Sequence, residues 1–172
     1  MNIRILIASI AFATSANAQT PYAEMQGRPI KALSDQQVAD LGAGRGMGLA
    51  LAAELNGYPG PSHVLELADK LELSAEQRAS MQRLFYSMKA EATPLGTKLI
   101  EQEADLDRQF ANRTVTPESL KASTSAAATQ GMLRETHLKY HLSTGHILTA
   151  TQLKKYAELR GYGGGHKHRH HH

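Results

Sequence analysis

The sequence predicts an all-α protein built from a long antiparallel helical hairpin with short flanking helices. Apolar residues recur every three or four positions between residues 81 and 110, as they do along the buried stripe of a helix. A helix-start pattern occurs three times, and no segment alternates apolar and polar residues as a strand does. Because one thin hairpin cannot cover its own apolar stripe, we also expect a dimer.

Residues 1–18 have the three parts of a secretory signal peptide. A basic start with Arg4 precedes an apolar run, Ile5–Ala13, and Ala16-Asn17-Ala18 supplies a small-x-small cleavage site. The run is shorter than the roughly 20 apolar residues that a helix needs to cross a bilayer, which disfavours an uncleaved anchor. We therefore expect a periplasmic chain that begins at Gln19 and has no integral membrane segment after cleavage.

Residues 19–60 form an N-terminal segment that is rich in glycine and helical in part. The helical signals run from Ser34 to Asn56, and four alternating glycines interrupt them between residues 42 and 48. These glycines follow no strand and lack the Lys-Ser/Thr ending of a P-loop. Close helix packing or a flexible segment is therefore favoured over a nucleotide-binding loop.

The recurring pattern Leu-[Ser/Thr]-x-x-Gln is a capping box that marks helix starts. Its hydroxyl accepts a hydrogen bond from the N3 amide, and its glutamine accepts one from the N–H of the cap residue. A further helix start is expected at Thr116-Pro117, with threonine as the cap and proline at N1. The capping-box residues are Leu33, Ser34 and Gln37, then Leu73, Ser74 and Gln77, and finally Leu148, Thr149 and Gln152.

Residues 61–162 are expected to form one helical domain. A short helix is predicted from Ser62 to Leu71, after the break at Tyr58–Pro61. The first long helix follows and ends at the turn Asn112–Thr114, and Pro94 inside it should cause a kink.

The returning helix of the hairpin is predicted from about Thr116 to Ser143, because Gly145 weakens the pattern beyond that point. A last helix should run from Thr149 to Arg160 and be closed by Gly161. The expected inner face of the returning helix comprises Leu120, Ala127, Leu133 and Tyr140.

Composition excludes several classes of function. The chain has no cysteine, so it has neither disulfides nor thiolate chemistry. Its formal net charge is only +3, with Lys and Arg spread among acidic residues, which disfavours nucleic acid as a partner. No nucleophile has an evident base, and the acidic residues between 101 and 107 do not converge on one helix face. We therefore expect no enzymatic activity.

The strongest chemical signal is the histidine-rich tail at residues 163–172, which follows three glycines. Neutral imidazoles on such a tail can bind Zn²⁺, Ni²⁺ or Cu²⁺ without a prebuilt geometry, and binding should weaken below about pH 6.5. The alternatives are a purification tag, interrupted atypically by Lys167 and Arg169, or a solvated basic end. No cofactor is expected to be obligatory. The tail imidazoles belong to His166, His168, His170, His171 and His172.

A second histidine group is predicted on the returning helix. His137 and His141 lie one helical turn apart, the spacing that lets two imidazoles share a metal. A metalloprotease would need Glu where Leu138 stands, so protease chemistry is disfavoured. Folding the hairpin about the predicted turn brings roughly Glu91 opposite His137 as a third ligand. The alternative places His137 beside the core and leaves His141 in solvent.

The last two capping boxes, separated by a helical hairpin after a signal peptide, resemble the paired LTxxQ motifs of the Spy/CpxP family. Ser74 departs from the family's threonine but preserves the cap. The resemblance covers about Pro61 to Tyr162, including the ending Tyr156–Tyr162, and leaves Gln19–Gly60 uncovered. It implies a thin, four-helix, cradle-shaped homodimer in the periplasm. Relatives include ATP-independent chaperones, stress-response modulators and heavy-metal sensors similar to CnrX and ZraP.

These observations together favour a soluble periplasmic metal-stress protein that binds transition metals and can shield unfolded periplasmic proteins. The alternatives are a Spy-like holding chaperone with no metal role and a heavy-metal sensor or regulatory protein. A client-holding surface needs apolar side chains interleaved with cations, although the same apolar residues could instead form the dimer core. The expected client contacts are Arg78, Arg83, Leu84, Phe85, Met88, Lys89 and Lys98.

Overall fold

The computed structural model describes residues 22–162. The predicted signal peptide and the histidine-rich tail both lie outside these described residues. Between residues 22 and 162 the chain is helical and contains no strand, as predicted. The elements are η1 (Ala23–Met25), α1 (Asp35–Gly42), α2 (Leu51–Glu54), α3 (Pro61–Glu66), α4 (Ala75–Ala111), α5 (Lys121–Ile147) and α6 (Ala150–Leu159).

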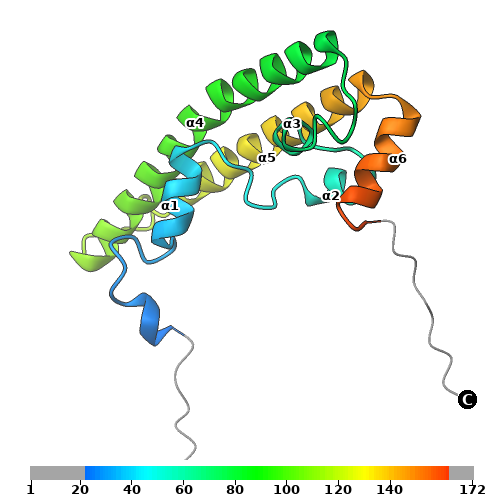
Figure 1. Cartoon of the computed structure of the whole chain (residues 1–172). Coiled ribbons are helices and arrows are strands. Elements are labelled where there is room, and N and C mark those ends of the chain that lie inside the picture. Colours follow the sequence, from blue (N-terminus) through cyan, green and yellow to red (C-terminus); the bar gives the residue numbers. More distant parts are fainter. Residues whose placement is uncertain (1–21, 163–172) are drawn as a thin grey trace, which may run out of the picture.

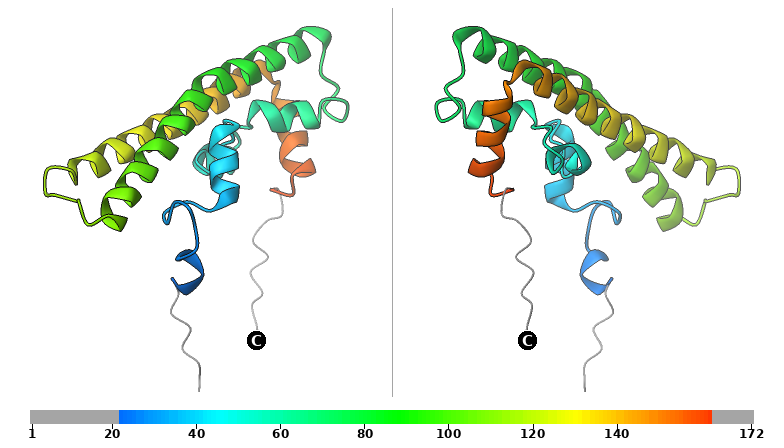
Figure 2. Two further views of the ribbon diagram at one scale, coloured as in Figure 1. Left: turned by 90° about the vertical axis from the view of Figure 1, so that its left-hand side faces the viewer. Right: turned by 90° about the vertical axis from the view of Figure 1, so that its right-hand side faces the viewer.

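The antiparallel hairpin of α4 and α5 is confirmed. Figures 1 and 2 show the two long helices running side by side, with α1, α2, α3 and α6 gathered on one side of the pair. Helix α4 has 37 residues and is about 55 Å long at 1.5 Å per residue. It continues through Pro94, whose ring lies on an exposed side of the helix.

The bounds of α5 differ from the prediction at both ends. Thr116 and Ser119 exchange hydrogen bonds between backbone N–H groups and hydroxyls, at 3.2 and 2.8 Å, and this closes an irregular turn over residues 117–120. The regular helix therefore begins at Lys121, and it continues through Gly145 to Ile147. The inner face also differs, since Leu120 and Ala127 are exposed while Ala126 and Leu133 are buried.

All three predicted capping boxes are present, at Ser34, Ser74 and Thr149. In addition, the glutamines of the second and third boxes bind each other. The Gln77 amide donates to Gln152 Oε1 at 2.9 Å, and the Gln152 amide donates to Gln77 Oε1 at 3.0 Å. This reciprocal pair ties the start of α6 to the start of α4, so each glutamine has a long-range role besides its local one.

Residues with a left-handed backbone conformation follow two of the shorter helices. Helix α3 stops at Glu66, earlier than predicted, and the chain then turns through Glu72 at φ 53°. Helix α6 closes as predicted: Gly161 has φ 75°, and the Tyr162 N–H donates to Ala157 O at 2.8 Å. These are the glycine position and the 6→1 hydrogen bond of a Schellman motif.

Two apolar clusters hold these helices against the hairpin. The first joins α3 and α6 to the start of α4, and the second joins α1 to the middle of both long helices. Gly96 sets the closest approach in the second cluster, because a Cβ there would collide with the Leu41 carbonyl oxygen. The buried members are Val64, Ala68, Leu71, Leu73, Met81, Leu148 and Tyr156 in the first cluster, and Leu41, Ala92, Leu99, Ala126 and Leu133 in the second.

The apolar stripe of α4 is thus covered within a single chain along most of its length, but not at its end, where Phe110 is 55% exposed. Met81, Met88, Ala92 and Leu99 are all buried, although no second protomer is present. The hairpin is not a bare pair of helices, because part of residues 22–60 packs beneath it. The dimer prediction rested on an uncovered stripe, and this stripe is buried at Met81, Met88, Ala92 and Leu99 but exposed at Phe110. The dimer itself stays a prediction.

A histidine-lined cavity as the candidate functional site

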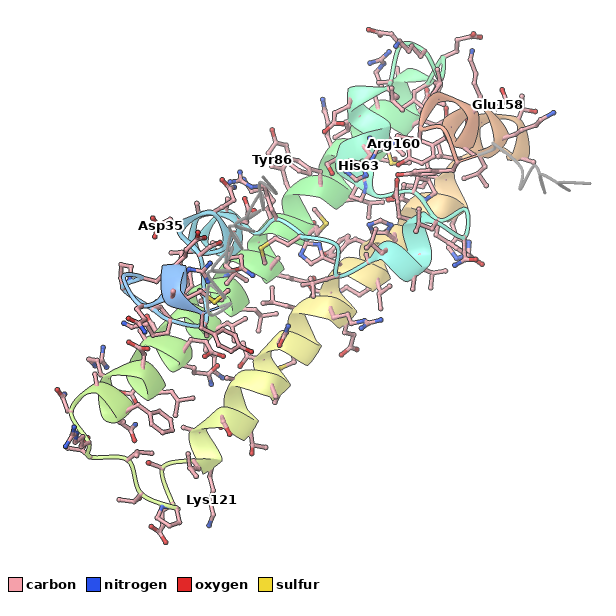
Figure 3. The ribbon with its side chains drawn as sticks, turned by 90° about the horizontal axis from the view of Figure 1, so that it is seen from below. Asp35, His63, Tyr86, Lys121, Glu158 and Arg160 are labelled. Carbon is pink, nitrogen blue, oxygen red and sulfur yellow. The ribbon has the colours of Figure 1, made fainter. Side chains whose placement is uncertain are left out.

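A cavity of about 600 Å³ lies between the hairpin and the segments packed beneath it. This volume is within the range of roughly 300–1,000 Å³ that small-molecule sites occupy. Its walls come from the glycine-rich segment (residues 43–48), α2, the start of α3, the middle of α4, the second half of α5 and the end of α6. Figure 3 looks at this side of the molecule, and it shows His63 and Arg160 close together near α3 and α6.

Three imidazoles line the cavity: His63 from α3 and His137 and His141 from α5. His137 is only 2% exposed, and its Nε2 has no hydrogen-bond partner among the described residues. Burial lowers the pKa of His137, and the neighbouring His141 lowers it further. His137 is therefore neutral near pH 7, with a ring nitrogen available to a ligand.

His141 has a fixed tautomer. Its Nδ1 lies 2.7 Å from the Tyr58 carbonyl oxygen, and because a carbonyl only accepts hydrogen bonds, Nδ1 carries the proton. When the ring is neutral, Nε2 keeps its lone pair. His141 is buried, so the part of the alternative that leaves it in solvent is wrong, whereas the burial of His137 agrees with the other part.

Glycines let the backbone close over these imidazoles. A Cβ on Gly46 would lie 3.2 Å from His137 Nδ1, and a Cβ on Gly60 would lie 2.8 Å from His141 Nε2. Gly44 and Gly48 have φ angles of 65° and 82°, which favour glycine. These contacts agree with close packing, one of the two alternatives that the sequence favoured over a nucleotide-binding loop.

The buried carboxylate of Glu54 organises one end of the cavity. Glu54 is 4% exposed and accepts hydrogen bonds from the Tyr156 hydroxyl, from the Tyr162 hydroxyl at 3.0 Å and from the Gly60 N–H at 3.2 Å. Three further nitrogens surround it. His63 Nδ1 lies at 3.5 Å, and His141 Nδ1 and Arg160 Nε each lie at 3.6 Å.

These partners decide the charge of Glu54. Burial by itself raises the pKa of a carboxyl, but His63, Tyr156 and Tyr162 outweigh that effect and lower the pKa of Glu54 to about 2. In the same contact, burial and the hydrogen bond to Glu54 raise the pKa of Tyr156. The ionised carboxylate therefore links α2 to the end of α6 over a wide pH range.

The predicted third metal ligand is not where the sequence placed it. Glu91 accepts hydrogen bonds from Lys139 Nζ at 2.5 Å and from the Tyr140 hydroxyl at 2.7 Å, and not from His137. The hairpin register is thus about one helical turn away from the predicted one. Within residues 22–162 no group of three or more His, Asp or Glu side chains is close enough together to hold a metal ion.

The predicted client contacts do not form one exposed surface. Met88 is buried, and it lines the cavity together with Phe85 and Lys89. Leu84 packs on the α3 cluster, and Arg78 pairs with Asp69 at 2.5 Å. Arg83 and Lys98 are exposed. Four other exposed apolar side chains lie between residues 47 and 58, at Met47, Leu51, Leu55 and Tyr58, and the first two also line the cavity.

The sequence alone does not indicate that Glu54, His63 and Arg160 belong to one site, because no spacing rule connects them. They lie on three separate short elements that meet only in the folded chain. A weak signal exists in Glu54, which is a single acid in the otherwise apolar stretch Leu49–Leu55.

Comparison of the chain with protein-family models, with curated proteins and with solved structures finds no match. Among residues 22–162, no helix has the length and apolar character needed to span a membrane.

Proposed function

We propose that this chain is an exported, non-enzymatic helical protein that binds transition-metal ions as part of a metal-stress response. The observation that carries the proposal is the gathering of His63, His137 and His141 in one cavity, in a chain whose sequence ends in five further histidines. The resemblance to the Spy/CpxP family and the predicted signal peptide support a periplasmic location.

The chemistry of the two α5 histidines suits this role. Histidines that ligate metals usually donate their second ring N–H to a carbonyl or carboxylate, which fixes the tautomer. His141 has this arrangement with Tyr58 O, and His137 offers a neutral ring with an unpaired Nε2. Neutral imidazoles suit Zn²⁺, Ni²⁺ and Cu²⁺. Because the cavity lacks a third ligand close to both, water or the tail would complete the coordination.

Calorimetric titration with Zn²⁺ and Ni²⁺ tests the proposal. Removing residues 163–172 should abolish the weaker, multiple binding and leave a tighter site that is lost in His137→Ala plus His141→Ala. His146→Ala is the matched control, because His146 is exposed on the same helix and lies outside the cavity. Unchanged stoichiometry after tail removal would contradict the role of the tail. Unchanged tight binding in the double variant would contradict the role of the cavity.

A second candidate function, ATP-independent holding of unfolded proteins, is favoured by the exposed apolar stretch Met47–Tyr58. Leu51 and Leu55 are 53% and 58% exposed, an unusual degree for two leucines one turn apart. The chain should then suppress aggregation of a chemically denatured substrate without ATP, and Leu51→Ser plus Leu55→Ser should reduce this suppression. Leu142→Ser, which changes an equally exposed leucine on α5, should not. Equal suppression by all variants would reject this surface.

If suppression occurs only when Zn²⁺ is present, the metal and holding functions are coupled. If it is absent with and without Zn²⁺, metal binding alone remains as the proposed function.

A further inference from the structure

Apart from His63 Nδ1, which lies 3.5 Å from Glu54 Oε1, two nitrogen groups of the cavity wall have no hydrogen-bond or ion-pair partner among residues 22–162. Lys89 lines the cavity, and within residues 22–162 its ammonium forms no ion pair. His137 Nε2, also in the wall, is buried without a hydrogen bond. A buried polar group normally has a partner, so the unpaired His137 Nε2, together with the half-buried ammonium of Lys89, indicates a ligand that supplies hydrogen-bond acceptors.

The other charges in the wall are already balanced. Asp40 pairs with Arg45 at 2.5 Å, and Glu54 lies 3.6 Å from Arg160 and accepts three further hydrogen bonds. Glu66, the remaining acid of the wall, is exposed. Lys89 is half-buried, and among the described cations of the wall its ammonium is the one without a carboxylate partner, which favours an anion.

The surfaces next to these nitrogens are apolar. Phe85 and Met88 stand on the same stretch of α4 as Lys89, and the Lys89 ammonium lies 5.9 Å from the centre of the Phe85 ring. Gly44, Gly46 and Gly48 also line the cavity and present no side chains. An apolar group would cover Phe85, Met88 and this backbone, whereas a bare inorganic anion would leave them uncovered.

We propose that the cavity binds a small organic carboxylate with a flat apolar body, and that its carboxylate accepts hydrogen bonds from Lys89 and His137. The apolar body would lie against Phe85 and Met88, under the glycine-rich segment. This inference goes beyond the proposed metal function and does not rest on it.

Three naphthalene probes that differ only in their polar group test the charge preference. They are naphthalene-1-carboxylate, naphthalene-1-carboxamide and 1-naphthylmethylammonium, titrated calorimetrically into the chain from Gln19 to His172 with EDTA present. The carboxylate should bind about tenfold more tightly than the amide, which is the ratio typical of one hydrogen bond to a charged group, and the ammonium should bind more weakly still. Equal affinities for the three probes would overturn the proposal. Loss of carboxylate binding on adding EDTA would also overturn it, because the anion would then be held by a metal.

Two pairs of variants test the location. Lys89→Met should reduce carboxylate affinity about tenfold, to the level of the amide, while Lys98→Met on the exposed part of the same helix should leave it unchanged. Gly46→Ala should weaken all three probes, because its Cβ presses on His137 at the cavity wall. Gly42→Ala meets no atom within 4 Å and is its control. Circular dichroism melting would verify that each variant is folded. Carboxylate binding that is unchanged in both Lys89→Met and Gly46→Ala would refute the site.

Discussion

Replacing Glu54 by glutamine should destabilise the protein by removing the charge that links α2 to α6. The substitution keeps the size and shape of the side chain, so the three hydrogen bonds it accepts lose strength without a cavity being created. The charge itself interacts with the nitrogens of His63, His141 and Arg160, each within 3.6 Å. Removing one member of a buried ion pair strongly lowers the free energy of unfolding, because the other charge is then left buried without compensation.

The magnitude follows from the pKa of Glu54. Folding lowers this pKa from 4.5 to about 2, which corresponds to about 3 kcal/mol of stabilisation at 1.4 kcal/mol per pH unit. Because the folded-state pKa is the lower one, this stabilisation is fully present above about pH 4.5 and is lost as the pH falls through 2. At pH 3, about 1 kcal/mol of it should remain.

Urea unfolding followed by helical circular dichroism, at pH 7 and at pH 3, measures the stabilisation by the Glu54 charge and its loss at low pH. At pH 7, Glu54→Gln should lower the free energy of unfolding by about 3 kcal/mol and the melting temperature by about 9 °C. Glu66→Gln, an exposed acid in the same cavity wall, is the control and should change stability by less than about 0.5 kcal/mol. A Glu54→Gln variant as stable as Glu66→Gln would refute the reasoning. A loss that is equal at pH 7 and pH 3 would assign the effect to packing instead of charge.

Three further predictions concern other contacts, all measured by thermal or urea unfolding. Gly96→Ala should cost about 1–3 kcal/mol by forcing α1 away from α4, whereas Gly131→Ala, with no atom within 4 Å, should stabilise by up to about 1 kcal/mol. Stability should fall as the pH drops below 6.5, because burial lowers the pKa of His137 in the folded chain and the unfolded chain then binds a proton more readily. His137→Gln should reduce this dependence of stability on pH. Gln77→Ala should cost about 1–2 kcal/mol, because it removes the hydrogen bond that Gln77 Oε1 accepts from the Ser74 N–H and the amide pair with Gln152. The exposed Gln82→Ala should cost almost nothing.

The features that could be predicted from the sequence depend on residues close together in the chain. A capping box needs only a hydroxyl and a glutamine three positions apart, and all three boxes form as predicted. The close of α6 at Gly161 is equally local. The helical periodicity of α4 and a turn signal after it were likewise enough to predict the hairpin.

The parts that could not be predicted depend on distances set by several elements at once. The connection between the long helices spans residues 112–120 instead of the three predicted, and Glu91 meets Tyr140 instead of His137. An apolar pattern reports which residues avoid water but not which element covers them. The sequence therefore did not reveal that Glu54 would be buried against Tyr156, more than 100 positions away in the chain.

The burial of α4 within its own chain limits the apolar surface that a dimer could bury. Burial of apolar surface drives most association, but the stripe at Met81, Met88 and Ala92 is already removed from water by α1, α3 and α5. A dimer that used this stripe would first have to displace the segment before α3, which also forms the cavity wall and carries Glu54. The exposed leucines at 51 and 55 require no such displacement. Leu51 also lines the cavity, so self-association through the exposed leucines would change one of its walls, whereas self-association through the stripe would displace the segment that carries Glu54. Both interfaces would therefore affect cavity binding.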